Sequence, residues 1–497
     1  MVWVMKFSEL LQAIGAAGVL SQQVGKDPEI LGVCEDSRKV KPGDVFVARG
    51  GTKVDGAKFV RDAVAAGAVA VISGERVDVT VPTAQVQNAN KALALAAHAV
   101  AGRPTDSLTV LAVTGTNGKT TITYLVRAII QAWGQKCGLI GTVQIDDGLK
   151  FVESEMTTPG PVDLTALFAR MKQNGVRYCA IETSSHALHQ DRVAGINFAV
   201  GMFTNLTQDH LDYHTTMDNY AAAKAILFEN LSPSATAVEN GDDAYAARMV
   251  RDSKARVVRY SVHGAGDWSA TIESMTSAGM KLRIKTPTGE TLALNSPLVG
   301  VYNVHNTLCA MGCAAALGVP TTVMIKALET CTGAPGRLQR VMIGKQSLPF
   351  QVFVDYAHTP DAVENVLKAL KPLTKGRLIC VFGCGGDRDR TKRPKMARAA
   401  QQLADVVVVT SDNPRTEAPQ QIFDDIVAGF GGDWRSDGRI VVEPDRRTAI
   451  NAAIKMAKQH DVILIAGKGH ENYQIVGKTK HHFDDVEEAE KAIAGVL

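Results

Sequence analysis

The segment Val113–Thr121 has the residue types of a phosphate-binding loop. It reads Val-Thr-Gly-Thr-Asn-Gly-Lys-Thr-Thr and lies between an apolar run and a stretch typical of a helix over 122–133. Glycines let a backbone wrap a phosphate, and the first turn of a helix points free N–H groups at it. Lys119 would reach the β- and γ-phosphates of a nucleotide, and the Thr120 hydroxyl would bind Mg²⁺. The strict pattern has glycine in place of Val113, so an ordinary strand–turn–helix corner is the competing interpretation.

Two later segments place acid and imidazole groups directly after apolar runs. Glu182 begins the first of them, which continues to His186, and the second includes His210 and His214. The carboxyl ends of parallel strands are the edge at which open α/β sheets bind ligands, and Glu182 is a natural Mg²⁺ ligand there. A lone histidine is usually structural, but histidines gathered at neighbouring strand ends favour a metal or phosphate site.

Three segments in the last third of the chain also follow strand-like runs directly. They are Gly383–Arg390, Ser411–Arg415 and Gly467–Glu471, and their placement predicts a shared crevice. The first segment is followed by a basic run, Lys392–Arg398. That run lacks the interleaved aromatic residues of a nucleic-acid site, so an anion site made of a few arginines is the better interpretation.

The elements that must position these groups follow from hydrophobic periodicity. After a first block of short strands and helices that ends at a turn over 102–104, strands and helices alternate, which indicates a mostly parallel sheet covered by helices. A strand-only stretch over 256–294 predicts an antiparallel edge, and a buried helix is expected over 308–319. We expect an α/β protein with a small N-terminal domain (1–106), a central P-loop ATPase domain (107–334) and a C-terminal Rossmann-like domain (335–497). The remaining predicted elements are strands at 108–113, 139–145, 178–182, 198–204, 352–355, 378–382, 406–410 and 462–466, and helices at 92–101, 163–173 and 218–229.

Composition excludes several classes of protein. The 497 residues are 45% apolar with a net charge of +3, which is typical of a globular chain and leaves no nucleic-acid footprint. The run 308–319 is too short to cross a bilayer, which takes about 20 residues. The eight cysteines are scattered and the N-terminus lacks a signal-peptide pattern, so we expect free thiols in the cytoplasm and no membrane partner.

The motifs together resemble those of the Mur ligases, the ATP-dependent amide-forming enzymes of peptidoglycan precursor synthesis. The matching segments occur in the family's order: TGTNGKTT, ETSSHAL, FTNLTQDHLDYH, AAAK, VDYAHTPD, FGCGGDRD, SDNPR and AGKGHE. The resemblance implies three domains, an acyl-phosphate intermediate, and ATP and Mg²⁺ as co-substrate and cofactor. It places catalytic or metal-binding roles at Lys119, Thr120, Glu182 and His210, and a carbamylated lysine at Lys224. The implied ATP-binding residues are Gly115, Thr116, Asn117, Gly118, Lys119, Thr120 and Thr121.

The resemblance also implies contacts with a UDP-linked muramoyl dipeptide. In this chain Met156 occupies the position of a family asparagine that precedes the paired threonines. The implied contacts are Glu35, Ser37, Thr52, Lys53, Val54, Thr157, Thr158, Ser184, Gln190 and Arg192.

Several motifs are those of the family branch that adds diaminopimelate. Arg415 offers a planar fork for the carboxylate that distinguishes diaminopimelate from lysine, and Glu471 can accept from an ammonium group. The lysine-adding branch, folylpolyglutamate synthetase and a nucleotide-dependent switch or motor are the alternatives. A monomer that binds only small molecules is expected. The implied diaminopimelate contacts are Arg388, Asp412, Asn413, Pro414, Arg415, Gly467 and Glu471.

Overall fold

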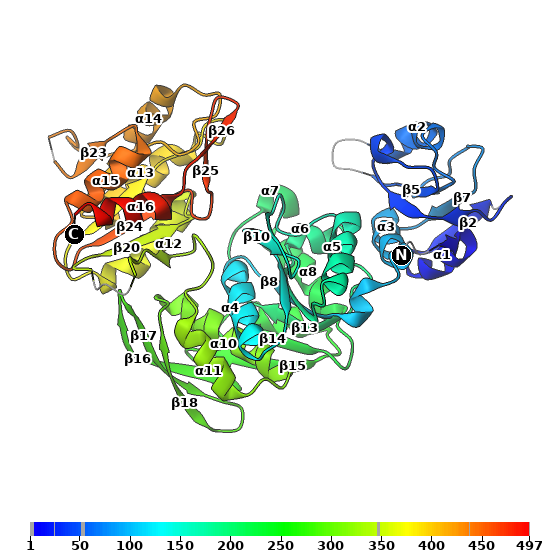
Figure 1. The fold of residues 1–497 in the computed structure, drawn as a ribbon, viewed down its shortest axis with the longest axis horizontal. Coiled ribbons are helices and arrows are strands. Elements are labelled where there is room, and N and C mark those ends of the chain that lie inside the picture. The colour runs from blue at the N-terminus through cyan, green and yellow to red at the C-terminus, as the bar shows by residue number, and fades with distance from the viewer. Residues whose placement is uncertain (1–3, 24, 51–54, 345–347, 437, 497) are drawn as a thin grey trace. The chain divides into compact units, whose positions relative to one another are not determined.

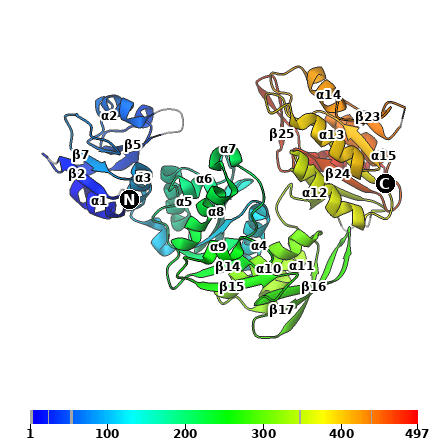
Figure 2. The ribbon, with the colours of Figure 1, turned by 180° about the vertical axis from the view of Figure 1, so that it is seen from behind.

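The computed structural model describes residues 4–23, 25–50, 55–344, 348–436 and 438–496. It divides into two compact units, seen from two sides in Figures 1 and 2. The first holds the chain up to Ser269 with 286–288 and 305–327, and the second holds 270–285, 289–304 and the chain from Leu328. The predicted α/β class is confirmed. The expected contacts Thr52, Lys53 and Val54 lie outside the described residues.

The first hundred residues form a five-stranded sheet of order β2-β7-β6-β5-β4. Strands β4 to β7 are parallel, and β2 runs antiparallel to β7. Helix α3 begins at Ala89, before the expected Ala92, because the Asn88 side chain accepts a hydrogen bond from the Lys91 N–H and caps the helix. The elements of this part are β1 (Met5–Lys6), α1 (Phe7–Ala13), β2 (Val19–Gln23), β3 (Glu29–Ile30), β4 (Gly32–Cys34), β5 (Asp44–Ala48), α2 (Val60–Ala65), β6 (Ala70–Ser73), β7 (Thr83–Val86) and α3 (Ala89–Val100).

The central sheet places three strand ends beside the phosphate-binding segment. Strand β8 lies between β12 and β13 and is parallel to both, with Glu182 opposite Val113 and Phe203 opposite Thr114. Helices α5 and α8 pack on the sheet face that presents Val110 and Ala112. The strands are β8 (Thr109–Thr114), β9 (Cys137–Ile140), β10 (Gln144–Asp146), β11 (Phe151–Glu153), β12 (Tyr178–Glu182), β13 (Phe198–Phe203), β14 (Thr236–Asn240), β15 (Arg256–Ser261) and β16 (Trp268–Thr276). The helices are α4 (Lys119–Ala132), α5 (Pro161–Gln173), α6 (Ser185–His189), α7 (Leu211–His214), α8 (Met217–Glu229), α9 (Ala246–Val250), α10 (Val301–Ala316) and α11 (Thr321–Thr330).

The predictions for three elements of this region were wrong in part. The strand predicted over 139–145 is two antiparallel strands, β9 and β10, because the chain turns around the Glu182 carboxylate, which accepts from the Thr142 N–H. The edge predicted as antiparallel is so in the hairpin of β17 (Gly279–Lys285) and β18 (Thr291–Ser296), while β15 pairs in parallel with β14 and β16. The buried helix α10 begins at Val301, not at 308, and includes the polar residues that were expected to precede it.

The C-terminal part is a six-stranded sheet of order β19-β20-β24-β21-β22-β23, parallel except for β19. Helices α12 to α14 cover one face and α15 and α16 cover the other (Figures 1 and 2). Strand residues therefore alternate between two buried faces, which explains their continuous apolar runs. The elements are β19 (Gln339–Arg340), β20 (Gln351–Asp355), α12 (Pro360–Leu370), β21 (Leu378–Phe382), α13 (Lys392–Leu403), β22 (Val406–Val409), α14 (Pro419–Val427), β23 (Ile440–Val442), α15 (Arg446–Lys455), β24 (Val462–Ala466), β25 (Tyr473–Val476), β26 (Thr479–His482) and α16 (Asp485–Ala494).

None of the helices in the part of the chain that the structure describes has the length and apolarity needed to span a bilayer. All eight cysteines are free, and seven of them are buried.

Candidate active site

The segment Gly115–Gly118 forms a tight loop between β8 and α4, and Lys119–Thr121 are the first three residues of α4. Gly115 has φ 147° and Gly118 has φ 88°, a backbone conformation that favours glycine. Space gives a second reason, because a Cβ on Gly115 would lie 1.8 Å from Thr204 Oγ1, and one on Gly118 would lie 2.5 Å from Asn306 Oδ1. The loop therefore has the backbone that a phosphate cradle requires, placed at a helix N-terminus.

Two lysines meet at the carbonyl groups of this loop. Lys119 Nζ donates to the Gly115 carbonyl at 3.0 Å and to the Thr116 carbonyl at 2.8 Å. From α8, Lys224 Nζ donates to the same Gly115 carbonyl at 2.8 Å and lies 4.4 Å from the centre of the Tyr220 ring. Lys224 is 1% exposed, and burial, followed by the charge of Lys119, lowers its pKa well below the ordinary value. The structure thus brings a weakly basic buried amine to the loop, and AAAK alone gives no sign of this.

Glu182 lies where its carboxylate was expected, at the end of β12 beside the loop. It is 1% exposed and accepts hydrogen bonds from Thr142 N at 2.8 Å and Thr142 Oγ1 at 3.0 Å. Thr120, the second residue of α4, is also buried. A buried carboxylate held in place by a neighbour, with a hydroxyl on the adjacent helix, is a donor set that fits Mg²⁺, which prefers oxygen ligands.

The histidines expected near the strand ends do come together, in different environments. The His186 ring centroid lies 5.0 Å from that of His210 and 5.4 Å from that of His214. His214 is buried, its Nε2 lies 2.9 Å from Ser185 Oγ, and burial, followed by the charge of His186, lowers its pKa to about 4. His210 is half-exposed, with φ 52°. His214 therefore has a structural environment, and His210 is the imidazole that remains open to a ligand.

No group of three or more His, Cys, Asp or Glu side chains could hold a metal ion by itself in the described ranges. A cation beside Thr120 and Glu182 would therefore draw further ligands from phosphate and water, as Mg²⁺ does in nucleotide sites. The metal-binding roles of Thr120, Glu182, His210 and Lys224 stay predictions.

Five of the expected contacts for the UDP-linked substrate form one network. Thr158 Oγ1 accepts from Ser184 N at 3.0 Å, and Arg192 Nη1 donates to the Thr158 carbonyl at 2.9 Å. Arg192 also donates to Gln190 Oε1, which positions both side chains. Thr157 Oγ1 lies 3.1 Å from Thr142 Oγ1, which links this network to Glu182. Sequence reasoning missed Thr142, because its role comes from the turn between β9 and β10.

Glu35 and Ser37 are the remaining substrate contacts among the described residues, and they lie outside that network, while Met156 contacts it at Arg192. Glu35 is ion-paired with Arg49, and both Glu35 and Ser37 line a cavity of about 1710 Å³ in the first unit. Met156 is 45% exposed, and its Sδ lies 3.8 Å from Arg192 Nη1. Met156 therefore approaches the same arginine without offering the amide of the family's asparagine.

The three C-terminal segments meet at the carboxyl edge of the neighbouring strands β24, β21 and β22. Asn413 Nδ2 donates to Glu471 Oε2 at 2.8 Å, and the buried Lys468 Nζ lies 3.1 Å from the same oxygen. Gly467 has φ 117°, and a Cβ there would lie 2.8 Å from Asp412 Oδ2. The expected contacts Asp412, Asn413, Gly467 and Glu471 are therefore together, and Lys468, which sequence reasoning did not single out, supports two of them.

Arg415 is held by its backbone while its side chain stays partly exposed. Its N–H donates to the Ile475 carbonyl, its carbonyl accepts from Gly477 N, and its Nη1 donates to the Gly386 carbonyl at 2.8 Å. Glu417, two residues further along the chain, is ion-paired with Arg393. Arg388 is exposed at the tip of the neighbouring loop, and Pro414 is buried.

The expectation that the basic run after Gly383–Arg390 forms an anion site is wrong at Arg393. Arg393 is 0% exposed and ion-paired with Glu417 and Asp425. Arg390, just before the run, pairs with Asp425 as well. Carboxylates from α14 and the preceding loop, distant in sequence, neutralise these guanidinium groups.

Comparison with known proteins agrees with this geometry. Family models match residues 29–112 (Mur ligase family, catalytic domain), 113–314 (Mur ligase middle domain) and 336–469 (Mur ligase, glutamate ligase domain). Two relatives, from Bacillus cereus and Synechococcus elongatus, are both named UDP-N-acetylmuramoyl-L-alanyl-D-glutamate–2,6-diaminopimelate ligase. The first is 44% identical over 95% of this chain and 96% of its own, and the second is 45% identical over 99% of both chains.

Solved structures give the same result. A structure of a UDP-N-acetylmuramoyl-L-alanyl-D-glutamate–2,6-diaminopimelate ligase superposes with a TM-score of 0.74 at 34% identity, covering 100% of this chain and 99% of that one. A folylpolyglutamate synthase from Mycobacterium tuberculosis shares the fold, with a TM-score of 0.59 at 21% identity over 75% of this chain and 91% of that one. From the family models and from relatives that match almost its whole length, the chain belongs to the Mur ligase family.

Proposed function

We propose that this protein is an ATP-dependent, ADP-forming ligase that adds meso-2,6-diaminopimelate to UDP-N-acetylmuramoyl-L-alanyl-D-glutamate. The observation that carries the choice of amine is the meeting of Arg415, Asn413 and Glu471 at one sheet edge. Glu471 offers a carboxylate to an ammonium group, and Arg415 offers a guanidinium to the carboxylate that lysine lacks. The relatives named for this reaction support the same choice.

The reaction begins at the loop Gly115–Thr121, which holds the ATP phosphates. A carboxylate oxygen of the UDP-linked dipeptide attacks the γ-phosphorus, the bond to the ADP oxygen breaks, and an acyl phosphate forms. The two reactants are both anions, so Lys119 is needed to offset their repulsion and the charge on the transferring group. Mg²⁺, bound through Thr120, Glu182 and His210, would supply further positive charge at the phosphates.

The second step is attack of the amine on the acyl carbon. The amine nitrogen forms the amide bond and loses a proton, and inorganic phosphate leaves. Glu471 and Arg415 bind the two ends of the diamino acid, so they orient the nucleophile and make the step effectively unimolecular. The network of Thr158, Ser184 and Arg192 would hold the UDP-linked substrate.

Lys224 would carry a carbamate in the working enzyme. Its amine is buried and its pKa is lowered, so the neutral form that reacts with CO₂ is easier to reach than in an exposed lysine. The cation first loses one proton to give the neutral amine, whose nitrogen then bonds to the carbon of CO₂ and releases a second proton. The two steps turn a cation beside the Gly115 carbonyl into an anion. A carbamate there would help to bind Mg²⁺ near the phosphates.

ADP release in a coupled assay tests the proposal, with diaminopimelate and lysine measured side by side. We expect turnover only when ATP, the UDP-linked dipeptide and diaminopimelate are all present. Turnover with lysine at equal efficiency would assign the chain to the lysine-adding branch. Turnover with a folate and glutamate would assign it to folylpolyglutamate synthesis, and turnover with ATP alone would indicate a switch or motor ATPase. The free thiols support a reducing compartment, the cytoplasm, as the place of the reaction.

A further inference from the structure

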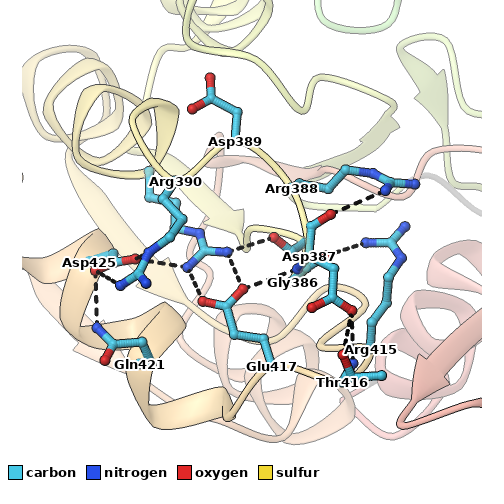
Figure 3. A network of polar contacts seen from close by, with 12 residues as sticks. Gly386, Asp387, Arg388, Asp389, Arg390, Arg415, Thr416, Glu417, Gln421 and Asp425 are labelled. Carbon is cyan, nitrogen blue, oxygen red and sulfur yellow. Dashed lines mark hydrogen bonds and ion pairs between the residues drawn. The ribbon is translucent and has the colours of Figure 1, made fainter.

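The loops that follow β21 and β22 are joined by an ion-pair network (Figure 3). Gly386 N donates to the Asn413 carbonyl at 2.9 Å. Asp387 Oδ2 accepts from both the N–H and the hydroxyl of Thr416, and the Asp387 N–H donates to Glu417 Oε2 at 3.0 Å. One loop carries Arg388 and the other carries Arg415, the two arginines proposed to meet diaminopimelate, so the network joins the halves of the amine site.

Arg393 is the centre of this network and is fully buried. Its Nη1 donates to Glu417 Oε1 at 2.7 Å and to Asp425 Oδ2 at 2.8 Å. Its Nη2 donates to Glu417 Oε2 at 2.7 Å and to the Gly385 carbonyl at 3.1 Å. One guanidinium thus reaches the first loop through Gly385, the second through Glu417, and helix α14 through Asp425. A lysine ammonium is a single point of charge and cannot make this planar set of contacts.

The two loops need to be held because each contains a strained residue. Asp387 and Arg415 both have φ 54°, in the left-handed region that residues other than glycine rarely adopt. Such residues persist only when their surroundings determine the conformation. The loops also approach closely, since a Cβ on Gly386 would lie 1.9 Å from the Pro414 carbonyl oxygen. Both strained residues lie at or next to a proposed diaminopimelate contact.

We propose that Arg393 is a positioning residue for amine selection. Together with Glu417 and Asp425, it holds Arg388 and Arg415 at the spacing that the distal carboxylate of the diamino acid requires. This inference rests on the proposed function and deepens it. Arg393 itself touches no substrate, because its side chain is 0% exposed. Arg393 keeps the Glu417 carboxylate ionised. Its hydrogen bonds to Glu417 are the largest of the causes that lower the pKa of Glu417 to about 2.

The network predicts that its loss weakens the binding of diaminopimelate and not that of the other two substrates. Loss of loop spacing would weaken the contacts of Arg388 and Arg415 with the distal carboxylate. The sites for ATP and the UDP-linked dipeptide, which are proposed in the first unit, would be unaffected. Lysine lacks the distal carboxylate, so its use would change little and the preference for diaminopimelate over lysine would fall. General destabilisation would instead lower the active fraction for both amines equally.

The test is steady-state kinetics of Arg393→Lys on the full chain, with KM measured for all three substrates. We expect KM for diaminopimelate to rise about tenfold or more, since a displacement of about 1 Å costs up to 100-fold. KM for ATP and for the UDP-linked dipeptide should stay within about twofold of wild type. Glu417→Gln should reproduce this pattern, and it decides the question if Arg393→Lys does not fold.

Arg377→Lys is the matched control. Arg377 donates to both the Asp461 carboxylate and the Met456 carbonyl at the opposite edge of the same sheet, so it is a similar ion pair without a loop of the amine site. It should lower the melting temperature without changing KM for diaminopimelate.

Two results would overturn the inference: an unchanged KM for diaminopimelate in folded Arg393→Lys, or an equal rise in Arg377→Lys. Wild type that does not ligate diaminopimelate would overturn the proposed function itself, and this inference with it.

Discussion

The ATP-site region and the amine-site region treat charge in opposite ways. Beside the phosphate-binding loop, burial lowers the pKa of Lys224 and of His214, so these two groups are weak bases. Around the loops after β21 and β22, Arg393 lowers the pKa of Glu417 to about 2, and Arg390 lowers that of Asp425, so these carboxylates are charged and paired with arginines.

This difference follows from what each region binds. The ATP-site region receives several anions at once, and its proposed function requires positive charge that is not already neutralised by protein carboxylates. The amine-site region must distinguish two similar amino acids, which requires fixed geometry more than net charge. Internal ion pairs supply that geometry in the amine-site region, while glycine conformation supplies it in the ATP-site loop.

The largest effect is expected from removing one charge in the ATP-site region. Lys119→Ala should lower kcat by about 10³-fold, because the γ-phosphate loses the charge that offsets its repulsion from the carboxylate. The melting temperature should stay near that of wild type, since the Lys119 side chain is partly exposed and donates to loop carbonyls. ADP release measures the effect, and Lys150→Ala, an exposed lysine of the same unit, is the control. Near-normal kcat in folded Lys119→Ala would contradict the phosphate-binding role of the loop.

A second change tests whether the buried amine becomes an anion. Lys224→Ala should lower kcat by about 100-fold, and added formate or acetate should restore part of the activity by replacing the carbamate. Intact-mass measurement of wild type, prepared with and without bicarbonate, should show a carbamate on the native protein. An unmodified amine in active enzyme with ATP bound would leave Lys224 as a buried cation.

The third change removes the Arg415 guanidinium group from the amine-site region. Arg415→Ala should raise KM for diaminopimelate by about 10- to 150-fold, the worth of a charge-assisted bidentate pair of about 1.5–3 kcal/mol. KM for ATP and the UDP-linked dipeptide should not change, and lysine should remain a poor substrate because no new acceptor replaces the guanidinium. Kinetics with each substrate varied in turn measure this. An unchanged KM for diaminopimelate would remove Arg415 from the amine site.

The same comparison explains what the sequence could predict. The ATP loop is one continuous segment whose glycines, lysine and threonine are all local, so Gly115, Lys119 and Thr120 could be assigned from spacing. Strand ends were predicted well enough to bring Glu182 and the loops of Asn413 and Glu471 to the right sheet edges, because continuous apolar runs mark strands buried on both faces.

The contacts that sequence reasoning missed all join distant segments. Arg393 was expected in an anion site because its neighbours in sequence are basic, but its partners Glu417 and Asp425 lie more than twenty residues away. The turn between β9 and β10 was missed because an apolar run does not show where a buried carboxylate bends the chain. Lys224 donates to the Gly115 carbonyl, 109 residues away in sequence, which no local pattern encodes.

The smallest predicted effect concerns how the stability of α3, in the first unit, and that of the amine-site region respond as pH falls. His98 in α3 is 4% exposed, and neither ring nitrogen has a hydrogen-bond partner in the described structure. Burial, followed by the charge of Arg103, lowers its pKa to about 4. Below about pH 6.5 the unfolded chain binds a proton at this residue that the folded chain does not, so stability present above pH 6.5 is lost as pH falls towards 4. The loss from this one group is at most about 1.4 kcal/mol per pH unit.

The amine-site region should not respond over the same range. Glu417 has a pKa of about 2 against 4.5 unperturbed, so its contribution to stability is complete above pH 4.5 and is lost only as pH falls towards 2. Hydrogen exchange at pH 7.0 and 5.5 measures both regions in one sample, after correction for intrinsic exchange rates. We expect the opening free energy of Ala89–Val100 to fall by about 1.2 kcal/mol, about an eightfold change in equilibrium, with peptides covering 385–417 unchanged. His98→Leu, which stays neutral at both pH values, should lose this response in α3. Equal loss in both regions, or a response that persists in His98→Leu, would mean that the buried histidine does not set the acid sensitivity of the first unit.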